Sequence, residues 1–277
     1  MCAAAAVVAA TVLTADAVPQ TVRATESTSR VAAANAFAAP DAMSAATTGG
    51  AWGAAPSTIS ATLYDSVSGR TVTVHGARRV YAASTEKVPI LLAALVAARG
   101  GNRAARAAIA SYAKPMIEHS DNTAATAIWR SAGRDAAIAR LRSQLHLTGT
   151  STAPTLYLPW DGVRTSSADM VLLLRAIVSA RSPLTRADSQ YVLSLMKAVD
   201  KTQAWGVSAG VRPADGVLIK NGWVPVPGHG WTVNTMGVVY GHGKYYCLAI
   251  TATDQPSMTA GISAVQRLAR QVSAHLG

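Results

Sequence analysis

The stretch TVNTMGVVYGHGKYYCLAITAT, residues 232–253, contains two runs of β-branched and aromatic residues separated by a Gly-His-Gly turn at 241–243. Runs of this composition favour β-strands, and a short turn between them is typical of an antiparallel pair. A further apolar run at 217–220 precedes this stretch, and a helical pattern of apolar residues at 257–276 follows it. The last third of the chain therefore predicts three strands and a terminal helix.

The remaining strands are expected near residue 57, far away in the sequence. Residues 57–63 and 71–75 alternate apolar and polar side chains around a turn at 65–69, which predicts a hairpin. Helical patterns fill the middle of the chain, at 84–99, 103–117, 121–132, 134–145, 167–180 and 185–197. This order differs from the strand–helix alternation of a parallel sheet. We expect an α+β fold, with one antiparallel sheet from both chain ends, helices on its faces and an inserted all-α subdomain.

The composition of the 277-residue chain excludes several classes of protein. Its 50% hydrophobic and 14% charged content is unlike that of a disordered chain, which is polar and rich in charge. Beyond the N-terminal apolar stretch, no run approaches the roughly 18 apolar residues that a membrane-spanning helix needs. The two cysteines, Cys2 and Cys247, cannot form a disulfide framework or a Cys-based zinc site, and the six histidines show no metal-binding spacing. We expect a monomer that contains neither a metal ion nor another cofactor.

The chain is basic, with 25 Lys and Arg against 14 Asp and Glu and a formal charge of +11. Nucleic-acid-binding proteins concentrate such charge in a run or stripe interleaved with aromatic residues. Here the longest basic run is Arg78-Arg79, and the chain has a single Phe. We therefore expect no nucleic-acid partner. An anionic cell-wall polymer or a small molecule with a carboxylate fits the charge better.

The first 55 residues differ in amino-acid composition from the rest. Residues 3–13 form a short apolar run followed by Ala15-x-Ala17, so residues 1–17 resemble a signal peptide. The alternatives are an Ala-rich arm and a single N-terminal anchor. Residues 18–55 are rich in Ala, Ser and Thr and predict a flexible linker. We expect one domain at 56–277 in a protein that is secreted or associated with the cell wall.

The first chemical motif is Ser84-Thr85-Glu86-Lys87, at the predicted start of a helix. Residues three apart lie on one face of a helix, so Lys87 should face the Ser84 hydroxyl. A desolvated lysine with a lowered pKa can take the proton of a serine, and a helix N-terminus favours the oxyanion that follows the attack. The alternative is structural, because Ser is also a good N-cap residue and Glu86 suits the first helical turn.

Two further motifs follow. Ser120-Asp121-Asn122 begins a predicted helix, where all three residue types also serve as caps. Lys220-Asn221-Gly222 ends a predicted apolar strand, where it can equally mark the start of a turn. Each motif alone is weak. The order Ser-x-x-Lys, Ser-Asp-Asn, Lys-x-Gly, with each motif at the edge of an element, indicates a serine acyl-transfer site.

With these motifs, residues 57–277 resemble the penicillin-recognising serine hydrolases, most closely the class A β-lactamase-like branch. The resemblance implies a five-stranded antiparallel sheet packed on helices, with an all-α subdomain. It implies that Ser84 is the acylated nucleophile, that Lys87 is its base and that Ser120 passes a proton to the leaving nitrogen.

The resemblance also implies the residues that bind the substrate. Asn122 would hold the substrate amide, and Lys220 would supply positive charge for a substrate carboxylate. Gly222 would allow the strand to approach the substrate. The backbone N–H groups of Ser84 and Trp223 would form the oxyanion hole.

Two departures from the family pattern matter for function. Class A β-lactamases use a Glu on a loop after Ser-Asp-Asn to activate the deacylating water, and this chain has no Glu after Ser120. The only acid of the corresponding loop, residues 152–167, is Asp161, which is either a substitute water base or a turn residue. Asn221 replaces the usual Thr or Ser, so a hydroxyl contact to the substrate carboxylate is lost, although an amide can still donate.

These observations predict a serine hydrolase that opens a β-lactam or related amide through an acyl-Ser84 intermediate, with weak deacylation. One alternative is a D-Ala-D-Ala peptidase or another penicillin-binding acyl hydrolase that acts on D-Ala-containing peptides of peptidoglycan. A different class is a non-catalytic cell-wall-binding module. The presence of Ser84, Lys87, Ser120 and Lys220 together argues against that class, because a structural role needs no such set.

Overall fold

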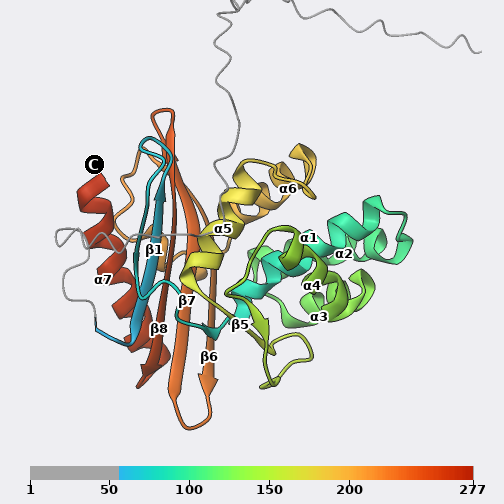
Figure 1. Cartoon of the computed structure of the whole chain (residues 1–277), viewed down its shortest axis with the longest axis horizontal. Coiled ribbons are helices and arrows are strands. Elements are labelled where there is room, and N and C mark those ends of the chain that lie inside the picture. The colour runs from blue at the N-terminus through green and yellow to red at the C-terminus, as the bar shows by residue number, and fades with distance from the viewer. Residues whose placement is uncertain (1–55, 277) are drawn as a thin grey trace, which may run out of the picture. The chain divides into compact units, whose positions relative to one another are not determined.

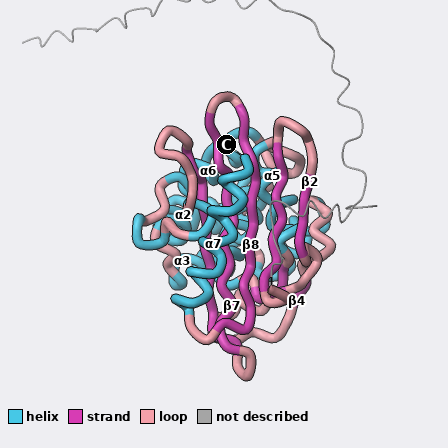
Figure 2. The backbone as a smooth tube through the Cα atoms, turned by 90° about the vertical axis from the view of Figure 1, so that its left-hand side faces the viewer, coloured by secondary structure: helices cyan, strands magenta, loops and turns pink. Residues whose placement is uncertain are grey.

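The computed structural model of the protein describes residues 56–276. A five-stranded antiparallel sheet crosses this region in the order β2-β1-β8-β7-β6. Its strands are β1 (Ile59–Asp65), β2 (Thr71–Val74), β6 (Gly216–Val226), β7 (Gly230–Gly241) and β8 (Lys244–Gln255). The first strand pairs with the last, so both ends of the described region meet in one sheet (Figure 2). The α+β fold with a sheet from both chain ends is confirmed.

Helices cover both faces of the sheet, as Figure 1 shows. The terminal helix α7 (Met258–Leu276) packs on β7 and β8 from one side. On the other side α5 (Ser167–Val178) packs on β1 and β8, and α6 (Arg186–Lys197) on β6. The inserted all-α subdomain consists of four helices that pack on one another: α1 (Lys87–Arg99), α2 (Arg103–Glu118), α3 (Asn122–Ala132) and α4 (Arg134–Gln144). None of the helices within 56–276 is both long and apolar enough to cross a membrane.

The alternation of side chains along the strands divides the core into two clusters, one on each face of the sheet. Leu218 faces the cluster shared with α1–α6, whereas its neighbour Ile219 faces the cluster under α7. Cys247 of β8 is fully buried in the first cluster, where it behaves as a small apolar residue. Burial raises the pKa of its thiol to about 12.

The structure corrects three expectations about local structure. Lys220-Asn221-Gly222 lies in the middle of β6, because the strand continues to Val226. The edge position of β6 tolerates Pro225, which has no N–H to donate. Ser84 lies in a short 3₁₀ helix, Ala83–Glu86, that precedes α1. A small second sheet, β3-β5-β4, has strands too short for a sequence pattern to reveal: β3 (Val80–Tyr81), β4 (Ser151–Thr152) and β5 (Val163–Thr165).

The predicted signal-like segment, 1–17, and the predicted linker, 18–55, lie outside the described residues, which begin at Pro56.

Candidate active site

Ser84 is partly exposed in its 3₁₀ turn, and this turn packs on strands β6 and β7 of the sheet. Asn234 of β7 is fully buried, and its amide donates to the carbonyls of Tyr81 (2.7 Å) and Ala82 (3.1 Å). Both amide hydrogens therefore fasten the segment that leads into Ser84. Asn234 was not among the predicted site residues, although a polar residue within an apolar strand is an indication of such a role.

Gly222 of β6 lies directly against the nucleophile turn. A Cβ atom at this position would be 2.7 Å from the backbone nitrogen of Ser84 and 2.8 Å from that of Thr85, so a larger residue does not fit. The structure thus places the Lys220-Asn221-Gly222 segment beside Ser84. Trp223, the next residue, is half-buried, and its ring centroid is 5.8 Å from that of Trp205.

Lys87 connects the motifs. Its side chain is fully buried, and Nζ lies 3.0 Å from Ser84 Oγ, 3.0 Å from Ser120 Oγ and 2.7 Å from Asn122 Oδ1. Nζ also donates to the backbone carbonyl of Ser120. The spacing of three residues therefore brings Lys87 to the Ser84 hydroxyl, as predicted, and Asn122 also contacts the amine.

Burial lowers the pKa of Lys87 to about 7, and the nearby carboxylate of Asp121 opposes this shift. At neutral pH a large fraction of Lys87 is therefore an uncharged amine, whose lone pair can accept a proton from Ser84. Asp121 also caps α3, because its carboxylate accepts the N–H of Ala124 at 2.6 Å.

Ser120 lies between two amines. Its backbone is left-handed (φ 58°), which turns its hydroxyl toward Lys87 on one side and Lys220 on the other. Lys220 is fully buried, and its Nζ donates to Ser120 Oγ (2.9 Å) and to the carbonyl of Asn221 (3.1 Å). Burial and the charge of Lys87 hold the pKa of Lys220 well below its usual value. The three predicted motifs thus meet around one serine hydroxyl.

Asn221 does not behave as expected. Its amide nitrogen donates to the carbonyls of Gln203 (2.6 Å) and Trp205 (3.0 Å), which uses both of its hydrogens. This amide therefore has no hydrogen left to donate to a substrate carboxylate. The longer Asn side chain reaches the loop that precedes β6, so it is engaged within the protein.

The loop at 152–167 presents an indole to Lys87. Trp160 is 2% exposed, its ring centroid is 5.3 Å from Lys87 Nζ, and its Nε1 donates to Thr126 Oγ1 at 3.0 Å. Asp161 is 6% exposed, and its two oxygens accept backbone N–H groups of residues 156–158 at 2.8–3.0 Å. Asp161 was predicted to be either a substitute water base or a turn residue, and this geometry fits the turn residue. Its carboxylate has little capacity left to bind a water molecule. The contact between Trp160 and Lys87 was not predicted from the sequence.

A buried ion pair anchors the nucleophile turn to the helical subdomain. Glu86 accepts a 2.6 Å hydrogen bond from Arg142 of α4, and both side chains are buried. Burial raises the pKa of Glu86, and the Arg142 charge opposes that shift. A favourable interaction with the helix dipole therefore explains only part of the role of Glu86, because its main partner, Arg142, lies 56 residues away in the sequence.

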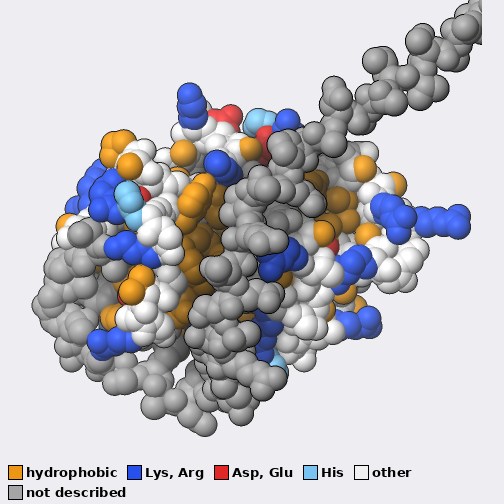
Figure 3. Space-filling model, turned by 90° about the horizontal axis from the view of Figure 1, so that it is seen from above, with side chains coloured by type: hydrophobic (Ala, Val, Ile, Leu, Met, Phe, Trp, Pro, Cys, Tyr) orange, Lys and Arg blue, Asp and Glu red, His pale blue; other side chains and the backbone are white. Residues whose placement is uncertain are grey.

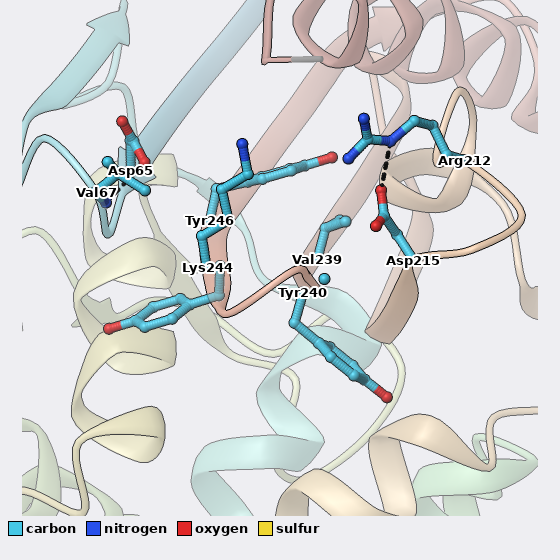
Figure 4. A pocket seen from close by; sticks show the side chains of 10 residues that line it. Asp65, Val67, Arg212, Asp215, Val239, Tyr240, Lys244 and Tyr246 are labelled. Atoms are coloured by element: carbon cyan, nitrogen blue, oxygen red, sulfur yellow. Dashed lines mark hydrogen bonds and ion pairs between the residues drawn. The ribbon is translucent and has the colours of Figure 1, made fainter.

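A separate pocket of about 260 Å³ lies at the end of the β7–β8 hairpin and contains none of the predicted site residues. An ion pair between Arg212 and Asp215 (2.8 Å) forms one side of it, beside Tyr240 and Tyr246 (Figure 4). No group of three or more His, Cys, Asp or Glu side chains suited to a metal ion is found among residues 56–276.

Comparison with known proteins gives the family. The model of the β-lactamase enzyme family matches residues 103–276. No curated protein matches the sequence. Among solved structures, PBP-A superposes with a TM-score of 0.67 at 22% identity, over 79% of this chain and 89% of that one.

An ancestral class A β-lactamase gives a TM-score of 0.66 at 21% identity, over 78% of this chain and 94% of that one. A β-lactamase from Sphaerobacter thermophilus DSM 20745 gives 0.65 at 20% identity, over 79% and 92%. A mutant of PBP-A, solved as an acyl-enzyme complex with penicillin G, gives 0.67 at 22% identity, over 79% and 90%. At these identities the structures show a shared fold. With the match of the family model over most of the domain, the chain belongs to the β-lactamase enzyme family and has the fold of a β-lactamase-like serine hydrolase.

Proposed function

We propose that the protein opens β-lactams or related amides through an acyl-Ser84 intermediate. The observation that carries this proposal is the position of Lys87. A fully buried amine with a pKa of about 7 lies 3.0 Å from each of two serine hydroxyls, Ser84 and Ser120. A general base for Ser84 needs a neutral amine within hydrogen-bond distance of the hydroxyl, and Lys87 meets both conditions.

The proposed acylation uses these groups in sequence. Ser84 Oγ attacks the carbonyl carbon while its proton passes to Lys87 Nζ. The oxyanion is held by the backbone N–H groups of Ser84 and Trp223, which the close contact of Gly222 with the turn supports. The C–N bond then breaks, and Ser120 gives its proton to the leaving nitrogen and recovers one from Lys87. Asn122, which is exposed, is available to the substrate amide.

We propose that deacylation is slow. Removal of the acyl group needs a base for the attacking water. The indole of Trp160 fills the loop side of Lys87, and the Asp161 carboxylate is occupied by backbone N–H groups. The same features are compatible with the alternative of a penicillin-binding peptidase-like hydrolase that acts on D-Ala-containing peptides.

An association with the cell wall is proposed from the N-terminal segment and the charge. Residues 1–17 have the pattern of an export signal. Three arginines, Arg78, Arg79 and Arg164, line a surface pocket of about 270 Å³ together with one acid, Asp254, and this excess of positive charge suits an anionic wall polymer. Other Lys and Arg side chains are spread over the face seen in Figure 3, with few acidic ones among them. A non-catalytic wall-binding module would use this surface alone.

Intact-mass spectrometry tests the proposal. The whole protein is mixed with benzylpenicillin or its methyl ester and sampled from seconds to hours, beside Ser84→Ala and, as a matched control, Ser194→Ala on the exposed side of α6. We expect a covalent adduct on the native protein and the control variant, and none on Ser84→Ala. Persistence of the adduct supports slow deacylation, whereas an adduct that decays while penicillin is consumed indicates turnover. No adduct with either compound contradicts the proposal.

A further inference from the structure

We propose that the part of the site beside β6, where the leaving group of the substrate lies, accepts an uncharged group, so that the substrates preferred by Ser84 carry no carboxylate on the leaving side. This inference rests on the proposed acylation of Ser84 and narrows its substrate class. The location follows from Ser120, because the group that receives its proton must lie near Ser120 Oγ, which is 2.9 Å from Lys220 Nζ.

Asn221 offers no hydrogen-bond donor to this part of the site. Both hydrogens of its amide go to the carbonyls of Gln203 and Trp205, at 2.6 and 3.0 Å. Its other polar atom, Oδ1, is buried without a partner and can only accept a hydrogen bond. A carboxylate also only accepts, so it gains nothing from this side chain.

The loop before β6 covers the strand at this point. Gln203 accepts the Asn221 amide through its carbonyl, and its own side chain donates to the carbonyl of His119 at 2.9 Å. His119 immediately precedes Ser120, so Gln203 bridges the two segments that flank the leaving group. The side chain of His119 itself turns to Asp200, at 3.6 Å.

Lys220 lies beside Ser120, but its amine is enclosed within the protein. Its side chain is fully buried, and Nζ already donates to Ser120 Oγ and to the carbonyl of Asn221. Burial and the charge of Lys87 also lower the pKa of Lys220, so this environment disfavours its charged form. A carboxylate here would lose its hydration and receive little in return.

Two indoles lie next to Asn221: Trp205, which is 9% exposed, and the half-buried Trp223. The rings of Trp205 and Trp223 lie 5.8 Å apart, and the Trp205 carbonyl is one of the two acceptors of the Asn221 amide. Indoles suit apolar or aromatic groups and offer only one donor each. An ester, an amide or a ring without an acid group fits such surroundings.

Matched substrates that differ only in the carboxylate test this inference. The second-order rate constant for acylation of the whole protein is measured with benzylpenicillin and with its methyl ester, by quenched-flow and intact-mass analysis. A site built for a carboxylate should prefer the acid by about tenfold or more, which is the worth of one hydrogen bond to a charged group. We expect the ester to react at least as fast as the acid.

A variant then tests the cause. Asn221→Thr removes the contacts with the loop and leaves a free hydroxyl, so the acid-to-ester ratio should rise about tenfold. Thermal unfolding checks that the variant folds. The acid-to-ester ratio of the native protein tests the inference even if the variant does not fold. A tenfold preference of the native protein for the acid overturns the inference and leaves the proposed function intact. No acylation by either compound overturns both.

Discussion

Deprotonation of Lys87 should control acylation between pH 5 and 9. A lysine with an ordinary pKa of 10.5 is neutral in roughly one molecule in 3,000 at pH 7. With the pKa lowered to about 7 by burial, about half of the molecules carry the free base at that pH. The shift therefore raises the fraction of competent enzyme by about three orders of magnitude. Because the neutral form is the active one, the rate should rise as the pH increases through about 7 and then level off.

The methyl ester of benzylpenicillin is a suitable probe, because it carries no carboxylate that could titrate or interact with the charge of the site. Its acylation rate constant is measured across this pH range for the native protein and for Asp121→Asn. The Asp121 charge raises the pKa of Lys87, and Asn can still cap α3, so the variant should reach its plateau at lower pH. A rate that is flat from pH 5 to 9, or that rises only near pH 10, would refute this account of Lys87.

Three further predictions concern neighbouring residues. Trp160→Glu places a carboxylate beside Lys87 that can act as a base for water, so the half-life of the acyl-enzyme should fall about tenfold or more. Tyr157→Glu, on the exposed side of the same loop, should leave this half-life unchanged. Mass spectrometry of adduct decay measures both variants. Glu86→Ala leaves Arg142 buried and unpaired, so denaturant unfolding should show a loss of about 3–5 kcal/mol, and a loss below about 1 kcal/mol would contradict the buried pair. Gly222→Ala brings a Cβ to 2.7 Å from Ser84 N, so acylation should slow by about 100-fold or more, and a rate close to native would contradict the tight contact.

Much of this fold can be predicted from local patterns. The runs of β-branched and aromatic residues along 232–253, with the short turn between them, predict the paired strands β7 and β8. The spacing of Ser84 and Lys87 gives their contact, because residues three apart meet on one helical turn. The capping role of Asp121 follows from its position before a helix.

The remaining features depend on contacts between distant segments. Asn234 and Tyr81 are 153 residues apart, and no local pattern links them. The partners of Asn221 depend on how the preceding loop folds over β6, and the position of Trp160 depends on its contact with Thr126 of α3. Lys220 was expected to serve a substrate carboxylate, but its burial and its bonds to Ser120 and Asn221 become visible only in the folded chain.

The most direct test of the central claim is the position of the acyl group. After reaction with benzylpenicillin or its methyl ester, the protein is denatured and cleaved with trypsin. Cleavage after Arg79 and after Lys87 should release residues 80–87, VYAASTEK. This peptide contains Ser84 as its single serine. The account predicts that the added mass lies on Ser84 in this peptide and is absent from the Ser84→Ala protein. Modification of another residue, or an unmodified peptide after prolonged reaction, would contradict it.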